Sequence, residues 1–403
     1  MTLSSARTTP TFDEDFVQDL HSRYAEIREA TPVQRMRTAS GEQVWVVTRY
    51  ADARAAFADS RLSKDFRREE TLESVSLDAF ERSYPKVLAE TMLTLDPPAH
   101  TRLRKLVTWA FTPRRVELLR SRVDVITSRL LDRIAEKPEV DVLDAFAYPF
   151  VAQVLCEVLG LDDSHCDDLR AWIGALYFSN DEESTGKAAY QIADYLSEVI
   201  ASKRRAPADD LSSWLIQVRD GTDRLDENEL VSTLFVLLVA GFETTVNVVG
   251  NGVFTLLQHP DQWAALRANP SLVSSAVEEI LRFEGPDVHA VLRHTKEPVT
   301  VGGVEIPTGE EVWLAVSSAH RDPNRYPDPD RFDITREPQH LAFGNGIHAC
   351  VGARLARMEV QIALRELIER FPNMALTRPA EEFRWRFSTS IRALETLPVR
   401  LGP

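Results

Sequence analysis

The sequence predicts a mainly α-helical protein with small β-sheets. Three observations lead to this fold class. Helical periodicity dominates the 403 residues, strand-like alternation is confined to a few short segments, and prolines such as Pro97-Pro98 and Pro113 separate the elements. No Gly/Ser linker, low-complexity tract or internal repeat divides the chain. We therefore expect one domain over residues 1–403, with β-rich portions at about 30–50 and 296–316.

The individual elements follow from periodicity, taken in chain order. Amphipathic patterns predict helices near residues 13–29, 50–57, 99–111, 114–136, 143–160, 164–179, 185–204, 226–258, 271–283 and 351–371. Alternating patterns predict strands at 43–48, 299–306, 311–316 and in the tail near 383–399. The segment 60–95 has little clear periodicity, so we expect a mobile loop with a short helix there.

The stretch 226–258 predicts an unusually long helix, about 50 Å at 1.5 Å per residue. Its middle is apolar nearly all round, which is typical of a helix in the centre of a large protein. Within it lies Ala240-Gly-Phe-Glu-Thr-Thr245. A threonine hydroxyl here can bond back to a carbonyl, and a buried Glu243 needs a reason because burying a charge is expensive. On these residues alone, a helix boundary at Gly241 explains the segment about as well.

Composition excludes several classes of partner. The formal net charge is 47 − 62 = −15, which disfavours nucleic acid and anionic lipid. Three cysteines without framework spacing indicate a reducing compartment. The N-terminus lacks an apolar segment, and the longest apolar run, 234–242, is far short of the ~20 residues of a membrane span. We expect a cytoplasmic protein without membrane insertion.

Cys350 lies in a glycine-rich loop, Phe343-Gly-Asn-Gly-Ile-His-Ala-Cys-Val-Gly352, just before a predicted helix. A helix N-terminus stabilises a thiolate, and glycines allow a flat, bulky group to approach the backbone. This combination suits an axial thiolate on a haem iron. A structural cysteine and a dinucleotide-binding loop are the alternatives. The second fits G-x-G-x-x-A at 344–349 but lacks a preceding strand.

This decapeptide resembles the haem-binding loop of cytochromes P450, Phe-Gly-x-Gly-x-His-x-Cys-x-Gly, and every fixed position matches. The resemblance covers residues from about 21 to 401 and looks most like soluble actinomycete members. It implies the P450 fold, a helical prism around a buried haem b with a long central helix. It implies that Cys350 is the iron ligand, with loop contacts to the haem from Phe343, Gly344, Gly346, His348, Cys350 and Gly352.

The Ala240–Thr245 segment is similar to the family's oxygen-activation motif on the central helix. The resemblance implies that Ala240 and Gly241 border the haem and that Gly241 leaves room for O2. It also implies that Thr244 and Glu243 deliver protons during oxygen activation. Glu243 stands where many relatives have aspartate.

Glu279-x-x-Arg282 matches a third family motif, and residues i and i+3 share a helix face. A surface ion pair worth under ~1 kcal/mol is one interpretation. The resemblance implies instead a buried structural pair joined by Arg331.

A fourth motif is Asp96-Pro-Pro-x-His100-x-x-x-Arg104. The resemblance implies that His100 and Arg104, together with Arg293 and His348, bind the haem propionates, for which the planar guanidinium is well suited. Each of these residues alone would also fit a solvated basic side chain.

Residues 101–122 reverse the sign of the overall charge, with seven basic residues and one acid, Glu117. Solvated helix faces are one interpretation, and a docking face for an acidic electron donor is the other. Because the chain contains no flavin or iron–sulfur segment, the resemblance implies electrons from an acidic ferredoxin and its NAD(P)H-dependent reductase. The basic residues are Arg102, Arg104, Lys105, Arg114, Arg115, Arg120 and Arg122.

Pocket residues are expected on variable segments of the family. The resemblance implies an apolar lining from Val236, Leu237, Ala240, Val291 and Ile391. His289 is the polar residue of this region. We interpret it either as a surface or haem-edge histidine or as a hydrogen-bond partner of a substrate oxygen.

Together these motifs predict a haem-thiolate mono-oxygenase. It would insert one oxygen atom from O2 into a C–H bond of an apolar small molecule such as a macrolide, another polyketide, a terpenoid or a steroid. Two alternatives stay open, a peroxide-dependent P450 and a non-catalytic haem-binding protein. We expect a monomer.

Overall fold

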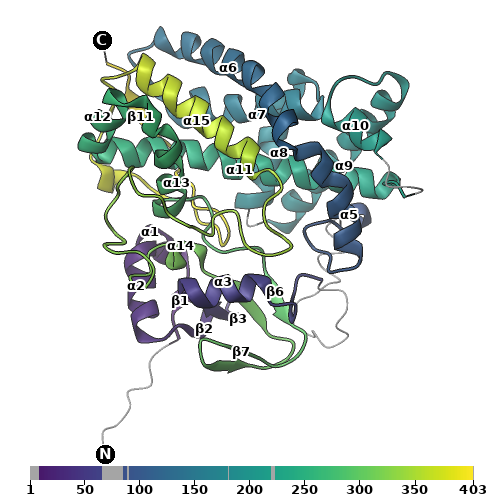
Figure 1. Ribbon diagram of the computed structural model, residues 1–403, viewed down its shortest axis with the longest axis vertical. Coiled ribbons are helices and arrows are strands. Elements are labelled where there is room, and N and C mark those ends of the chain that lie inside the picture. Colours follow the sequence, from purple (N-terminus) through teal and green to yellow (C-terminus); the bar gives the residue numbers. More distant parts are fainter. Residues whose placement is uncertain (1–8, 66–84, 89, 180, 219–222, 403) are drawn as a thin grey trace, which may run out of the picture.

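The mainly α prediction is confirmed by the computed structural model, which describes residues 9–65, 85–88, 90–179, 181–218 and 223–402. A large helical part lies above a smaller part that holds most strands (Figure 1). Part of the segment predicted as a mobile loop, 66–84 and residue 89, lies outside the described residues. The helical part contains α5 (Ala99–Thr108), α6 (Pro113–Ala135), α7 (Tyr148–Leu159), α8 (Cys166–Phe178), α9 (Glu182–Arg205), α10 (Leu211–Gln217), α11 (Glu227–Gln258), α12 (Pro260–Ala268), α13 (Val273–Phe283) and α15 (Ala353–Arg370).

The smaller part is built on a six-stranded sheet, counted over the described residues, with strand order β1-β2-β3-β9-β6-β4. A β7–β8 hairpin and the helices α1, α2, α3 and α14 accompany it (Figure 1). A second hydrophobic cluster joins this sheet to α3 and α14. The elements are α1 (Glu14–Gln18), α2 (Leu20–Ala30), α3 (Tyr50–Ala58), α14 (Val316–Ala319), β1 (Thr11–Phe12), β2 (Val33–Thr38), β3 (Gln43–Val47), β4 (Leu62–Ser63), β6 (Arg293–Thr295), β7 (Val299–Val301), β8 (Val304–Ile306) and β9 (Glu311–Leu314).

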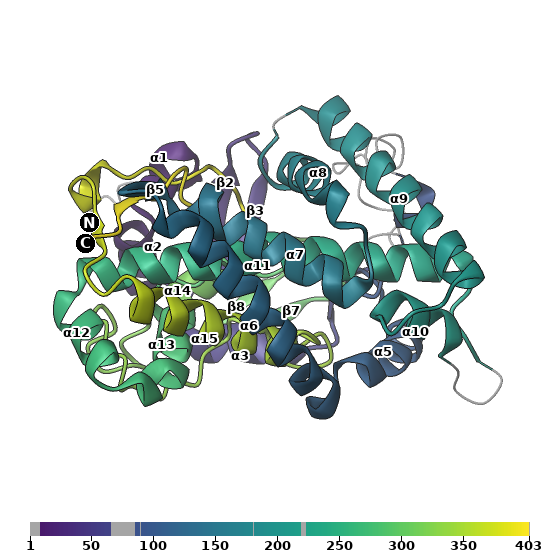
Figure 2. The ribbon, with the colours of Figure 1, turned by 90° about the horizontal axis from the view of Figure 1, so that it is seen from above.

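α11 is the central helix, as predicted. It begins at a capping box in which Asp226 accepts from the Glu229 amide and Glu229 accepts from the Asp226 amide, both at 2.9 Å. It then runs through the middle of the helical part, against α7, α9, α13 and α15 (Figure 2). Its length and apolarity alone would suit a membrane span, but 67% of its most apolar window is buried inside the protein. α11 is therefore a core helix.

Two glycines let neighbouring elements approach α11 closely. A Cβ on Gly250 would lie 2.5 Å from Leu143 Cδ2, and one on Gly252 would lie 3.1 Å from Ile280 Cδ1. The second contact brings α13 against α11. The close packing of α13 matters because α13 carries the buried ion pair described below.

Some sequence predictions of elements were wrong. The tail near 383–399 forms only β11 (Pro398–Arg400), which pairs with β5 (Glu139–Asp141) and β10 (Ala375–Leu376), and two isolated bridges, Trp385–Leu394 and Ile391–Asp287. β2, α10 and α12 were not predicted as separate elements. β2 has only two apolar residues in six, so its alternation is weak, and α12 follows α11 directly at Pro260.

Glu279 and Arg282 form a fully buried pair on α13. Arg282 donates from Nε and Nη2 to the two Glu279 carboxylate oxygens at 2.8 Å. It also donates to the carbonyl oxygens of His320 at 2.9 Å, Pro329 at 2.7 Å and Arg331 at 3.3 Å. Every charge and proton of the pair is therefore held, which is the condition for tolerating buried ions.

Arg331 joins this pair as expected, but through its main-chain carbonyl, which accepts from Arg282, and not through its side chain. The Arg331 side chain is 67% exposed and lies 3.8 Å from the Asp333 carboxylate. Arg336 approaches Glu279 instead, with Nε 3.4 Å from Oε1. A resemblance in sequence did not distinguish which of the two arginines points inward.

We predict that Arg282→Ala lowers the free energy of unfolding by about 3–5 kcal/mol, because it leaves the Glu279 carboxylate buried without its partner. Soluble yield and the thermal unfolding midpoint measure this. Arg331→Ala is the matched control and is expected to change stability by less than about 0.5 kcal/mol. Equal midpoints for the two variants would contradict the structural role of the pair.

Candidate active site around Cys350

The Cys350 loop is held in shape by its own backbone. Cys350 N donates to Phe343 O at 2.8 Å, and Gly344 N donates to Leu341 O at 2.8 Å. Gly344 and Gly346 have φ of 70° and 80°, which favours glycine. A Cβ on Gly346 would also lie 3.0 Å from Phe57 O of α3. The loop thus packs against α3 and requires glycine at Gly346 for two reasons.

Cys350 is accessible and lies three residues before α15, whose N-cap is Gly352. Although the residue is accessible, the protein atoms packed around its sulfur exclude water and so raise the pKa of its thiol. A hydrogen bond from the Gly352 amide lowers this pKa. That amide is the kind of donor that steadies a sulfur anion once a positive centre is bound to it. The structure therefore presents Cys350 as a ligand atom on a fixed loop.

Five basic side chains gather near this loop, and sequence analysis named four of them. The His100 and His348 rings lie 4.1 Å apart, and Arg104 donates to Ala349 O of the loop. Arg293 is buried and donates to Val291 O at 2.8 Å. The fifth, Lys64, is buried as well.

The pKa values show that these groups repel one another. Burial first, and then Lys64, His100, Arg293 and Arg104, lower the pKa of His348 to about 2. Burial, Arg293 and Arg104 hold the pKa of Lys64 well below its usual range. Among the described acids only Asp96 acts to raise the pKa of Lys64, and the Asp96 carboxylate also accepts hydrogen bonds from Ser63 and Lys296.

The site fits the carboxylates of a haem. His100 is 2% exposed, yet neither ring nitrogen has a hydrogen-bond partner among the residues that the structure describes. A buried polar group without a partner is costly, and converging cations require an anion. Two propionates beside a thiol ligand would meet both needs. Lys64 was missed from sequence because it lies outside the quoted motifs, directly after a two-residue strand.

The middle of α11 has one accessible face. Leu237, Ala240, Gly241 and Thr244 are accessible or half-buried, while most of the surrounding residues are buried. Their spacing of three and four places them on one side of the helix. Thr244 Oγ1 donates to Ala240 O at 2.5 Å, so its hydroxyl is held on that side.

Glu243 lies on a different side of α11, buried at 1% exposure. Asn247 Nδ2 donates to its Oε2 at 3.1 Å, and Oε1 has no partner. Burial raises the pKa of Glu243 to about 7, despite Arg386, Asn247 and Arg170, which act to lower it. Glu243 can therefore exchange a proton near neutral pH, next to the Thr244 hydroxyl in sequence.

The predicted pocket residues differ in position. Leu237 is half-buried on the accessible face of α11, and Val291 is 39% exposed. Val236 and Ile391 are buried but belong to neither hydrophobic cluster of the described residues. Ile391 forms a bridge with Asp287.

Both interpretations of His289 were wrong. The side chain is buried, bonded to the Tyr24 hydroxyl through Nε2 and to Thr389 O at 2.5 Å through Nδ1. Its ring packs on Phe12 and Trp313, and burial lowers its pKa to about 4. With both nitrogens used inside the protein, His289 is a core residue that is not available to a ligand.

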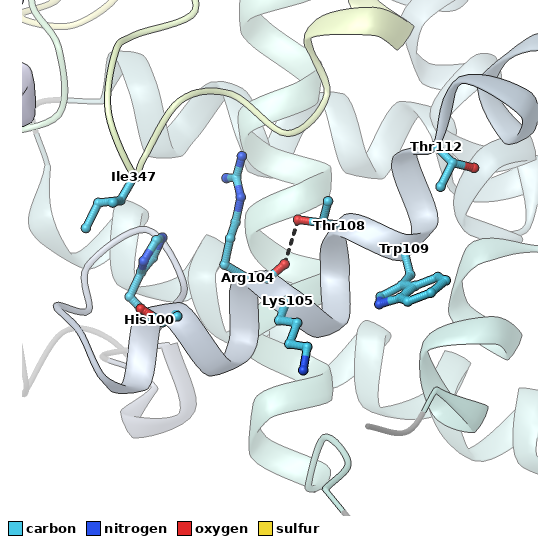
Figure 3. A pocket seen from close by; sticks show the side chains of 8 residues that line it. His100, Arg104, Lys105, Thr108, Trp109, Thr112 and Ile347 are labelled. Carbon is cyan, nitrogen blue, oxygen red and sulfur yellow. Dashed lines mark hydrogen bonds between the residues drawn. The ribbon is translucent and has the colours of Figure 1, made fainter. Parts of the chain in front are cut away.

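A surface groove of about 590 Å³ lies beside the Cys350 loop (Figure 3). It runs along α5, past Lys105 and the 60% exposed Trp109, with Ile347 of the loop at its edge.

Some of the basic residues of segment 101–122 form ion pairs with acidic residues, which the sequence did not indicate. Arg102 pairs with Asp223 and Glu229, and Arg120 and Arg122 pair with Glu117 and Glu157, respectively.

A second group of potential ligand atoms lies apart from this loop in sequence. Cys156 at the end of α7 and Cys166 at the start of α8 bring their sulfurs to 3.6 Å, and an Asp163 carboxylate oxygen lies within 4.8 Å of both.

We predict that Lys64→Ala weakens haem retention, because one charge-assisted contact to a propionate is lost. Transfer of haem to an excess of apomyoglobin should become roughly tenfold faster. Lys187→Ala, which removes an exposed lysine of α9, is the control. An unchanged transfer rate for Lys64→Ala would remove Lys64 from the haem site.

The comparisons agree with this geometry. Residues 163–384 match the family model described as cytochrome P450. The chain is 50% identical over 394 residues to cytochrome P450 107B1 of Saccharopolyspora erythraea, covering 97% of both chains. It is 42% identical to 6-deoxyerythronolide B hydroxylase of the same organism, covering 98% of this chain and 99% of that one.

Solved structures agree as well. The tirandamycin C-bound P450 mono-oxygenase TamI superposes with a TM-score of 0.89 at 42% identity, covering 98% of this chain and all of that one. The Bacillus subtilis P450 PksS also gives 0.89, at 35% identity with 97% and 99% covered. A thiol loop, a basic cluster suited to carboxylates and an accessible central helix thus coincide with likeness over nearly the whole chain. The protein belongs to the cytochrome P450 family, as a mono-oxygenase of the bacterial type whose cofactor is haem iron.

Proposed function

We propose that this protein is a haem b mono-oxygenase that inserts one oxygen atom from O2 into a C–H bond of an apolar natural product, a macrolide or another polyketide first. The observation that carries the proposal is Thr244 on the accessible face of α11, with the protonatable Glu243 beside it in sequence. The names of relatives support the substrate class, among them 6-deoxyerythronolide B hydroxylase and the tirandamycin C-bound TamI. A vitamin D(3) 25-hydroxylase is 43% identical to this chain, which supports a steroid as a second substrate class.

Haem iron bound through a thiolate supplies oxygen activation and O–O cleavage. In this chain Cys350 would be the ligand on its fixed loop, with Phe343, Gly344, Gly346 and Gly352 shaping that loop. His100, Arg104, Arg293, His348 and Lys64 would hold the propionates. Ala240 and Gly241, on the accessible face of α11, would border the bound group. Leu237, Val236, Val291 and Ile391 would supply apolar lining.

Proton delivery would fall to Thr244 and Glu243. The Thr244 hydroxyl donates to Ala240 O and can turn to donate toward the accessible face instead. With a pKa of about 7, Glu243 is protonated in a large fraction of molecules at neutral pH and can pass a proton on and take up another. A peroxide-dependent enzyme would not need such a pair, and neither would a haem-binding protein without turnover.

Electrons would come from an acidic ferredoxin and its NAD(P)H-dependent reductase. The groove along α5 is the face we assign to this partner, since it lies beside the Cys350 loop and offers Lys105 and Trp109. Three of the seven basic residues of the cluster, Arg102, Arg120 and Arg122, pair with acids and so contribute less to this attraction. We place the enzyme in the cytoplasm as a monomer.

We predict that Thr244→Ala lowers the yield of product per NAD(P)H roughly tenfold or more and releases peroxide, because proton delivery to the distal side is lost. Coupling is measured as product and peroxide formed per NAD(P)H consumed. Thr244→Ser, which keeps the hydroxyl, should restore most of the coupling. Unchanged coupling in Thr244→Ala would remove this residue from the mechanism.

We predict that reduction by ferredoxin slows as ionic strength rises from about 50 to 300 mM, because screening weakens attraction between opposite charges. Lys105→Glu should lower the second-order rate of reduction severalfold at low salt, measured by stopped-flow absorbance. Lys187→Glu on α9 carries the same charge change away from the groove and is the control. Salt-independent reduction would contradict the docking face.

A further inference from the structure

Asp287 lies on a short segment whose backbone is held by hydrogen bonds at the residues before and after it. It follows α13 and precedes β6. Arg392 N donates to Pro286 O at 2.7 Å, and Val288 N donates to Ser390 O at 2.9 Å. Asp287 itself forms an isolated bridge with Ile391. Its backbone is therefore set in place before any ligand arrives, which is what a specific contact requires.

The Asp287 carboxylate is only partly accessible and has no hydrogen bond or ion pair among the described residues. Burial alone raises its pKa to about 7, and no cation acts in the opposite direction. Glu284, three residues earlier, shows how a buried carboxylate is usually stabilised, by pairing with basic side chains. It is held by His21 at 3.1 Å and Arg392 at 3.0 Å, and its pKa lies far below the ordinary value. A carboxylate left unpaired inside a protein needs an explanation.

The surroundings of Asp287 identify the region that it faces. Its charge raises the pKa of the Tyr177 hydroxyl, although burial is the larger cause. Tyr177 lies on α8, and its hydroxyl donates to Val239 O of α11 at 3.5 Å. Asp287 therefore lies within electrostatic reach of α8 where it contacts the centre of α11.

We propose that Asp287 is the specificity-determining residue of this enzyme and selects substrates that present a hydrogen-bond donor, above all a positively charged amine, close to the reacting carbon. The proposal rests on the proposed function, since it takes the region between Cys350, α8 and α11 as the substrate site. It also replaces His289, whose nitrogens are both used in the core, as the polar contact of this segment.

The chemistry of the pair explains the preference. In a poorly solvated site an ammonium group would supply both the charge and the donor that the carboxylate lacks, and a hydroxyl would supply only the donor. A substrate carboxylate would place two like charges together and would be rejected. The apolar Ile391, bridged to Asp287, and the exposed Val291 four residues further along the chain would hold the rest of an otherwise hydrophobic molecule.

The test uses three probes that share an unbranched ten-carbon chain and differ only at one end: decyltrimethylammonium, 1-decanol and decanoate. The quaternary nitrogen carries the positive charge without an N–H donor and has no lone pair, so this probe tests the charge alone and cannot bind iron, while 1-decanol tests the donor alone. Dissociation constants are measured by calorimetry on the haem-loaded protein, together with the shift of the ferric haem band. The native protein should bind the cation at least tenfold more tightly than decanoate. Asp287→Asn should lose roughly tenfold of this ratio, with 1-decanol changing less than about threefold.

Two further variants keep the result interpretable. Asp287→Glu retains the charge and should retain the preference for the cation. Glu183→Gln removes an exposed acid at the start of α9 and should leave the ratio unchanged. A cation-to-carboxylate ratio that stays within twofold in Asp287→Asn, with haem bound, would overturn the proposal while leaving the mono-oxygenase intact. A protein that binds no haem, and hence responds to no probe, would instead overturn the proposed function and this inference with it.

Discussion

The buried Glu279–Arg282 pair is the constraint on which the Cys350 loop depends. Arg282 donates to the carbonyl of His320, and the His320 ring accepts from Leu341 N at 2.8 Å. Leu341 O then accepts from Gly344 N, which begins the turn that ends at Cys350. Burial, His340 and Arg282 hold the pKa of His320 well below its usual range, so its imidazole stays neutral and can accept. One hydrogen-bonded series thus runs from the ion pair to the ligand loop.

The charged side chains in the interior fall into two groups, those paired with an opposite charge and those without such a partner among the described residues. Glu279 and Glu284 are paired with arginine and stabilise the fold. Within the described part of the chain, the cations around His100 and His348 have few acids near them and Asp287 has no cation, so these groups are suited to binding a ligand. The first set belongs to the scaffold and the second to the site. This division, more than pocket shape, separates the residues that hold the protein together from those that would hold its ligands.

The sequence predicted the elements whose physical pattern is strong. α11 could be predicted because it is apolar on nearly every side, and the Cys350 loop because glycine, histidine and cysteine recur at fixed positions. It failed where the outcome depends on the direction of a side chain. Arg331 and Arg336 are equally basic, and only the fold decides which approaches Glu279. Likewise His289 and Asp287 are two residues apart, yet the first is satisfied in the core and the second is not.

The orientation of Glu243 would separate the route by which protons arrive from the face at which the substrate binds. Its carboxyl lies on a different side of α11 from the accessible face, toward Tyr148 and Asn247. The Arg170 guanidinium stacks on the Tyr148 ring at 4.0 Å and pairs with Asp144, whose carboxylate reaches the surface. A large molecule that fills the accessible face therefore leaves the inner side of the helix untouched. If Glu243 delivers protons as proposed, they would be taken up from behind α11 while a bulky substrate covers the accessible face, so tight enclosure of that substrate and rapid proton uptake would not compete.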